Sequence, residues 1–70
     1  MNLDKVKQEV KDLLGKRVVI IYSIGRNKEE LIEGVINGLY KSLFTLKTTY
    51  YTRSFSYQDI ITKDIIIKRL

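Results

Sequence analysis

Apolar residues recur at spacings of three and four positions from residue 3 to residue 14, with charged and amide side chains between them. This spacing places the apolar side chains on one stripe of an α-helix. Asn2 can cap the first turn, and Gly15 can adopt the left-handed conformation that ends a helix. We therefore predict a helix over residues 3–14 that docks its stripe onto the rest of the protein. The stripe consists of Leu3, Val6, Val10, Leu13 and Leu14.

Beyond Gly15 the pattern changes to β-branched residues and to apolar positions that alternate with polar ones. A polar stretch containing Gly25 and Asn27 separates the first such run from a second that resumes at Leu31, which is typical of a hairpin. Three further runs follow after short connections, so five strands are expected. The runs outside the second strand cover residues 17–23, 42–48, 51–57 and 63–70.

Five short strands leave two exposed sheet edges unless the sheet closes on itself. Gly34 and Gly38 flank Ile36 inside the second strand, where glycine favours a sharp bend. These features predict a mainly β protein: a helix over residues 3–14, then a small five-stranded antiparallel β-barrel of the Sm-like or Src-homology-3-like kind over residues 16–70. Seventy residues leave room for a single domain, over residues 1–70.

Some apolar residues face away from the expected interior. Val19, Ile21 and Ile66 alternate out of phase with the inward positions of their strands. Either the helical stripe or a second copy of the chain can cover them, so a homo-oligomer is an open possibility.

The chain contains no cysteine, histidine or tryptophan. Their absence excludes thiol nucleophiles, histidine acid–base chemistry, disulfides and the commonest zinc sites. Glu29, Glu30 and Glu33 lie close together, but this spacing is more typical of a solvated strand start than of a metal site. Asp59 is expected to accept bonds from backbone amides in a short turn between the last two strands. We therefore expect no catalytic residue, no metal, no cofactor and no enzymatic activity.

Thirteen Lys and Arg against eight Asp and Glu give a net charge of +5 and a pI near 9.6. This balance suits an anionic partner, although solubility alone would also favour it. The first twelve residues carry frequent charges and no apolar run, which is unlike a secretory signal or a membrane anchor. The expected location is the cytoplasm, away from a membrane.

Cationic and aromatic side chains are the candidate binding residues, because several of them can share one rim of a barrel. Aromatic faces beside cations can stack on single-stranded nucleic acid, and the same residue types are favoured at protein interfaces. Tyr22 and Tyr40 can instead fill the barrel ends, and Tyr50 with Tyr51 can be a scaffold pair near a hairpin tip. The candidates are Lys16, Arg17, Arg26, Lys28, Tyr40, Tyr50, Tyr51 and Arg53.

Several separated motifs together resemble the Veg family of small bacterial proteins. Residues 15–18 (Gly-Lys-Arg-Val) look like its first-strand start, residues 25–28 (Gly-Arg-Asn-Lys) are similar to its basic hairpin tip, and residues 33–36 (Glu-Gly-Val-Ile) resemble its second-strand glycine motif. The aromatic segment 40–44 also fits the family pattern. The most specific motif is Ser-Phe-Ser-Tyr-Gln-Asp-Ile-Ile-Thr at residues 54–62.

The resemblance implies a helix with a small barrel and a non-enzymatic cytoplasmic protein. It also implies a role in regulating transcription and biofilm formation. We expect this role to act through contact of the barrel rim and exposed tyrosines with a protein partner such as a transcriptional regulator. Nucleic-acid binding by the basic rim residues is the alternative, and Glu29 and Glu30 weaken it because they reduce the positive potential of the hairpin tip.

Overall fold

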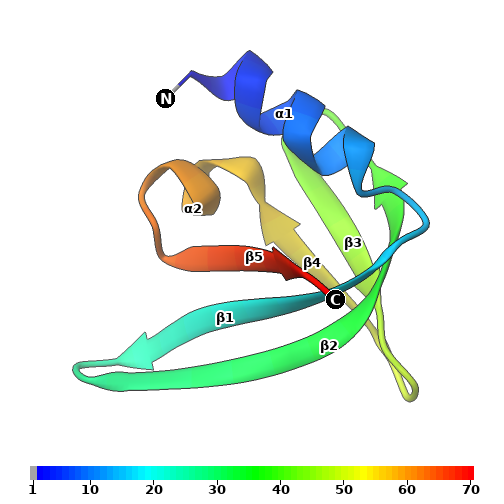
Figure 1. The fold of residues 1–70 in the computed structure, drawn as a ribbon. Coiled ribbons are helices and arrows are strands. Elements are labelled where there is room, and N and C mark those ends of the chain that lie inside the picture. The colour runs from blue at the N-terminus through cyan, green and yellow to red at the C-terminus, as the bar shows by residue number, and fades with distance from the viewer. Residues whose placement is uncertain (1) are drawn as a thin grey trace.

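The structure is a computed structural model that describes residues 2–70. Its elements follow the order of the sequence prediction, with one additional helix before the last strand (Figure 1). They are α1 (Leu3–Asp12), β1 (Arg17–Gly25), β2 (Lys28–Leu39), β3 (Leu43–Lys47), β4 (Thr52–Ser56), α2 (Tyr57–Ile61) and β5 (Ile65–Arg69).

Helix α1 begins and ends as its capping residues predict. The Asn2 side chain accepts a hydrogen bond from the Lys5 amide at 2.8 Å, and Gly15 has a φ of 80°. The regular helix is two residues shorter than predicted, because the amides of Leu13 and Leu14 bond back three residues rather than four. Such tightening of the last turn satisfies carbonyls that a helix end leaves unpaired.

Strand β2 organises the sheet because it pairs with two strands in succession. Its first part, up to Val35, pairs with β1, and its last part, from Val35 to Leu39, pairs with β3 with a register shift between Ile36 and Gly38. An irregularity of this kind bends a strand. The predicted bend in the second strand is therefore confirmed, and it turns the β3–β4 hairpin over the inner face of β1 (Figure 1).

The two glycines of β2 each make room for a neighbour. A Cβ atom on Gly34 would lie 2.5 Å from the carbonyl oxygen of Lys47 on β3. A Cβ atom on Gly38 would lie 2.6 Å from the Thr45 hydroxyl and 2.9 Å from the ring of Tyr40. At Gly34 the obstacle is backbone, which cannot rotate aside, so this position requires glycine.

The sheet curls but does not close, so the prediction of a closed barrel is wrong. Across the described residues the strand order is β4-β3-β2-β1-β5, which leaves β4 and β5 as opposite edges with no pairing between them. Helix α2 contacts both edge strands. The chain leaves β4 in a helical turn, which does not present strand-like hydrogen-bonding groups to β5, and closure would require such pairing.

Helix α2 replaces the end of the fourth predicted strand and the turn after it. The Ser56 hydroxyl caps this helix by accepting from the Gln58 amide at 3.1 Å. The role predicted for Asp59 is therefore filled by Ser56, because an N-cap side chain reaches the first free amides of a helix whereas Asp59 already lies within it. The Asp59 carbonyl accepts from the Thr62 hydroxyl at 3.3 Å.

The core lies between α1, α2 and the concave face of the sheet. Val6 and Val10 of α1 are fully buried there, so the helix docks on the core of its own chain, next to α2. The Phe44 ring lies 5.9 Å from Phe55 and 5.5 Å from Tyr57, at distances that favour aromatic pairing. The remaining buried apolar side chains are Val18, Ile20, Ile32, Ile36, Leu46 and Ile65.

The opposite, convex face of β5, β1 and β2 carries apolar residues, as the alternation predicted. Ile66, Ile21 and Leu31 are cross-strand neighbours in successive strands, and we call them the outer row. Ile66 is 43% and Leu31 is 69% exposed. Helix α1 does not cover this row, because its buried valines join the inner core.

We expect Gly34→Ala to destabilise the protein by about 1–3 kcal/mol, because the added methyl group overlaps the Lys47 carbonyl. Urea unfolding measures the loss. Ser23→Ala, at an exposed position of β1, is the control and should stay within about 0.5 kcal/mol of the parent. Equal stability of the two variants would show that the β2–β3 approach does not require glycine.

Burial raises the pKa of the Tyr57 phenol above its ordinary value of 10.0, and a hydrogen bond with the Tyr40 backbone acts in the opposite direction. The folded state therefore holds this proton more tightly than the unfolded state. The contribution of Tyr57 to the free energy of unfolding is consequently lost as the pH rises above about 10. Tyr57→Phe should remove this alkaline loss. The difference in unfolding free energy between parent and variant should stay constant from about pH 7 to pH 9 and shift in favour of the variant near pH 11. A constant difference throughout would contradict the burial argument.

Candidate partner-binding surface

The connection between β3 and β4 is a tight, hydrogen-bonded turn that we call the tyrosine tip, residues 48–51. The Thr48 amide donates to the Tyr51 carbonyl at 2.8 Å. The Thr48 hydroxyl donates to the same carbonyl at 2.9 Å and accepts from the amides of Tyr51 at 3.1 Å and Tyr50 at 3.4 Å. One threonine therefore fixes the backbone on both sides of the turn.

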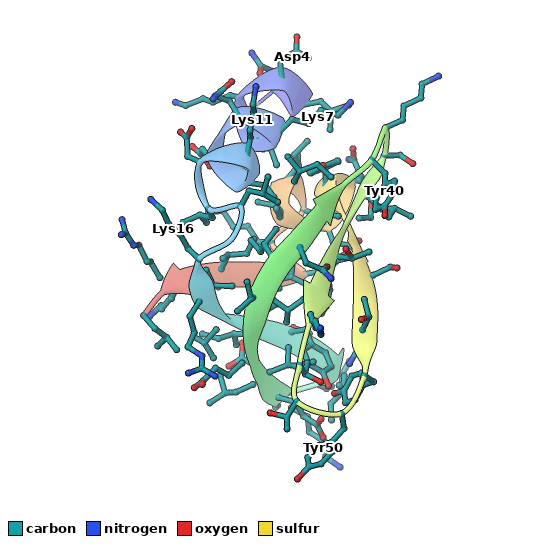
Figure 2. All side chains as sticks on the ribbon, turned by 90° about the vertical axis from the view of Figure 1, so that its right-hand side faces the viewer. Asp4, Lys7, Lys11, Lys16, Tyr40 and Tyr50 are labelled. Atoms are coloured by element: carbon teal, nitrogen blue, oxygen red, sulfur yellow. The ribbon has the colours of Figure 1, made fainter. Side chains whose placement is uncertain are left out.

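The two rings of the tyrosine tip are presented to solvent. Tyr50 is 92% exposed and Tyr51 is 53% exposed. Figure 2 shows Tyr50 at the end of the molecule opposite α1. An exposed aromatic ring on an ordered turn loses little conformational freedom when it binds, because the backbone that carries it is already fixed.

A shallow groove of about 310 Å³ lies beside the tyrosine tip, between β1, β2 and β3. Arg17 and Glu33 form one side, and their side chains pair at 3.3 Å. Lys47 and Thr48 form the other side. The Arg17–Glu33 pair is exposed, so it contributes little to stability, but it partly neutralises the charge of Arg17 on this side of the groove.

Arg53 has a different environment from the other cationic candidates. Its guanidinium lies 4.2 Å from the centre of the Tyr22 ring and 5.2 Å from that of Phe55. The Tyr22 hydroxyl in turn donates to Glu30 at 3.0 Å. Arg53 therefore connects the start of β4 to the end of β1 across the curled sheet through cation–π contacts, so it is a packing residue as well as a charge.

The basic hairpin tip between β1 and β2 lies apart from the tyrosine tip. Arg26 and Lys28 are exposed there, and Glu29 follows directly in β2. Arg17 stands at the opposite end of β1, and eight residue steps along a strand correspond to roughly 26 Å. The two ends of β1 therefore present their cations to separate regions of the surface.

The last two candidates lie toward the helical end of the molecule. Tyr40 follows β2 and is 59% exposed, with its ring close to Gly38. Lys16 lies between α1 and β1, where its carbonyl accepts from the Ile36 amide at 3.4 Å. In Figure 2 Tyr40 lies toward the α1 end of the molecule, far from Tyr50.

Among the predicted candidates, Tyr50 and Tyr51 form the tip, Arg17 lines the groove beside it, and Arg53 follows two residues after Tyr51 in β4. The structure separates the others, which are Lys16, Arg26, Lys28 and Tyr40. Sequence reasoning missed Thr48 and Lys47, which complete this surface. A threonine two residues before a tyrosine pair, at the end of a strand, is the signal for such a turn, because threonine hydroxyls bond backbone amides two or three residues ahead.

The described residues also limit what other chemistry the surface offers. Across residues 2–70, no group of three or more His, Cys, Asp or Glu side chains lies together as a metal site requires. In the same part of the chain, no helix has the length and apolar character needed to cross a membrane. The expectations of no metal, no cofactor and no catalysis stay predictions.

These features define a small antiparallel β protein with a docked helix and an ordered, exposed aromatic turn. A family model described as "Biofilm formation stimulator VEG" matches residues 1–68. The chain belongs to the Veg family, and the resemblance identified from its motifs is confirmed. No curated protein matches the chain.

We expect Thr48→Val to loosen the tyrosine tip, because it removes the hydroxyl contacts but keeps the side-chain shape. Its free energy of unfolding should fall by about 1 kcal/mol, and amide exchange at Tyr50 and Tyr51 should accelerate. Thr48→Ser keeps the hydroxyl and should resemble the parent in both measurements. Unchanged exchange in Thr48→Val would mean that the backbone alone holds the turn.

Proposed function

We propose that this protein promotes biofilm formation as a non-enzymatic cytoplasmic regulator that contacts a transcriptional regulator through the tyrosine tip and the adjacent groove. The family description supports the biological process. The molecular step rests on one observation: the most exposed aromatic side chain of the described residues, Tyr50, stands on a turn that Thr48 holds in one conformation.

The distribution of charge supports a protein partner over a nucleic acid. Phosphate binding requires several cations along one continuous surface. Here Arg17 pairs with Glu33, Arg53 lies over Tyr22, and the basic hairpin tip stands at the other end of β1. The net charge of +5 is therefore dispersed, whereas exposed tyrosine and arginine side chains suit the centre of a protein interface.

Nucleic-acid binding remains the second candidate, because Lys47 and Arg17 lie beside two exposed rings. Stacking of bases on tyrosines next to cations is a common mode of single-strand recognition.

We also propose that the scaffold is related to Sm-like or Src-homology-3-like barrels, since a small barrel opened between its edge strands would leave a curled five-stranded sheet.

If the proposal is right, the tyrosine tip provides most of the free energy of binding to the regulator. A tagged parent protein should capture a transcriptional regulator from its own cells, and the purified regulator should bind the purified parent. Tyr50→Ala combined with Tyr51→Ala should weaken that binding by about tenfold or more, which corresponds to hot-spot residues. Arg26→Ala combined with Lys28→Ala is the matched control and should bind as the parent does.

Labelled single-stranded DNA and RNA separate the two candidates. The proposal expects no binding at low salt. Salt-sensitive binding that is lost in the tyrosine variant would overturn the protein-contact proposal in favour of the second candidate, because phosphate contacts weaken steeply as salt rises.

A further inference from the structure

Strand β5 presents one row of backbone groups away from the sheet. The Asp64 carbonyl accepts from the Ser23 amide, and the Leu70 amide donates to the Arg17 carbonyl, each at 3.2 Å. Even-numbered residues of this strand therefore direct their N–H and C=O groups toward β1. Because the direction alternates along a strand, the groups of Ile65, Ile67 and Arg69 point to the free edge.

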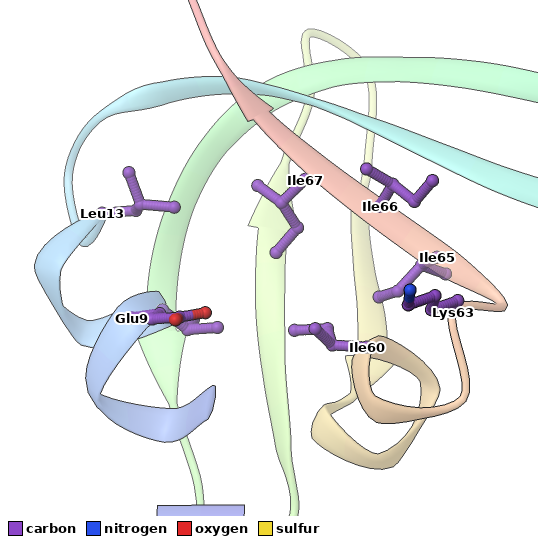
Figure 3. A pocket seen from close by; sticks show the side chains of 8 residues that line it. Glu9, Leu13, Ile60, Lys63, Ile65, Ile66 and Ile67 are labelled. Carbon is purple, nitrogen blue, oxygen red and sulfur yellow. The ribbon is translucent and has the colours of Figure 1, made fainter. Parts of the chain in front are cut away.

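An apolar cavity borders this edge, and we call it the edge groove. Ile65 and Ile67 of β5, Ile60 of α2 and Leu13, the residue after α1, line it, and its volume is about 380 Å³ (Figure 3). Glu9 of α1 and Lys63 add one acidic and one basic group to its lining. A strand edge next to an apolar groove is a surface that a further strand can extend, because it offers both hydrogen bonds and apolar contact.

We propose that β5 pairs antiparallel with β5 of a second copy of this chain, with the twofold axis at Ile67. In this register the outward backbone groups of Ile67 face those of Ile67 in the second copy. Ile65 faces Arg69 of the second copy, and the reverse pair follows by symmetry. Three such residue pairs form about six backbone hydrogen bonds and join the two sheets into one.

The charges of β5 are self-complementary in this register. Asp64 directly precedes β5, and its carboxylate accepts from the Thr62 hydroxyl at 2.8 Å. Asp64 and Lys68 are both exposed, and the alternation of the strand places both on the convex side with Ile66. In this register Asp64 of one copy directly faces Leu70 of the other copy, so Lys68 of that other copy lies diagonally across from Asp64. The dimer contains two such diagonal pairs. Opposite charges at such cross-strand positions are attractive.

The same pairing covers part of the outer row. Ile66 lies directly opposite Lys68 of the second copy, whose aliphatic stem can pack on the exposed isoleucine while its ammonium group reaches Asp64. A foreign strand of uniform negative charge would instead face Asp64 at one end. A second copy therefore fits this edge better than an acidic peptide, because the strand carries an acid at its start, isoleucines in its centre and bases at its end.

Charge reversal at the two diagonal positions tests this register. We expect the parent to form a dimer in sedimentation equilibrium. Lys68→Asp alone places two pairs of negatively charged side chains across the interface, and Asp64→Lys alone places two pairs of positively charged side chains there. Each variant should therefore raise the dimer dissociation constant by about tenfold. An equimolar mixture of the two variants restores both attractive pairs and should form a heterodimer at the parent's dissociation constant.

Circular dichroism and urea unfolding establish that each variant is folded, which is expected because both positions are exposed. A parent that stays monomeric at millimolar concentration would overturn the proposal. So would a mixture that dimerises no better than the separate variants, because that result would assign the dimer to another surface, such as β4 or the outer row.

The absence of native cysteine allows a second test of the axis. Ile67→Cys should form a disulfide-linked dimer on mild oxidation, since directly opposed strand residues lie within disulfide range. Thr49→Cys, on the tyrosine tip, should stay unlinked under the same conditions. Equal linking of the two variants would contradict a twofold axis at Ile67.

Discussion

The close approach of β2 and β3 at Gly34 is the constraint on which the rest of the structure depends. Strand β2 serves two hairpins, so it must bend where it leaves β1 and joins β3. The missing side chain at Gly34 lets the Lys47 carbonyl come near, and the register shift before Gly38 completes the turn. This bend carries Phe44 and Phe55 over the inner face of β1, which creates one continuous core. It also sets Lys47 and Thr48 beside Arg17, which builds the groove next to the tyrosine tip.

The second consequence of the bend is a curled sheet whose edges do not meet. Helix α2 connects those edges through a capped turn and contributes Tyr57 to the core, where its ring meets Phe44. The interior is therefore closed by helices instead of strand pairing, with Val6 and Val10 of α1 completing it. A sheet finished in this way keeps two free edges of unlike character: β4 exposes Thr52 and Ser54, whereas β5 borders apolar side chains.

Local features of the sequence predicted the elements that depend on local physics. The buried part of the α1 stripe, the Asn2 cap, the left-handed Gly15 and the alternating strands all follow from spacing and residue type. Leu3 and Leu14, which were predicted at the ends of the stripe, are exposed instead. Helix α2 escaped prediction because its isoleucines favour strands, and only the capping hydroxyl of Ser56 marks its start. The contact between Arg53 and Tyr22 joins residues distant in the chain, so no pattern along the sequence could reveal it. The cationic and aromatic residue types of the candidate surface were predictable from the sequence. Which of these residues lie close together depends on the geometry of the bend of β2, which the sequence pattern does not specify.

The strand order also decides whether self-association and partner binding can coexist. The tyrosine tip connects β3 and β4 at one side of the sheet, whereas the proposed dimer forms through β5 at the other. Pairing of two β5 strands therefore leaves both tips uncovered, and the dimer presents two equivalent aromatic turns. A partner with twofold symmetry can engage both at once, and the second contact then forms at a high effective concentration. Two modest tyrosine contacts can in this way give firm binding, without the continuous basic surface that this chain lacks among its described residues.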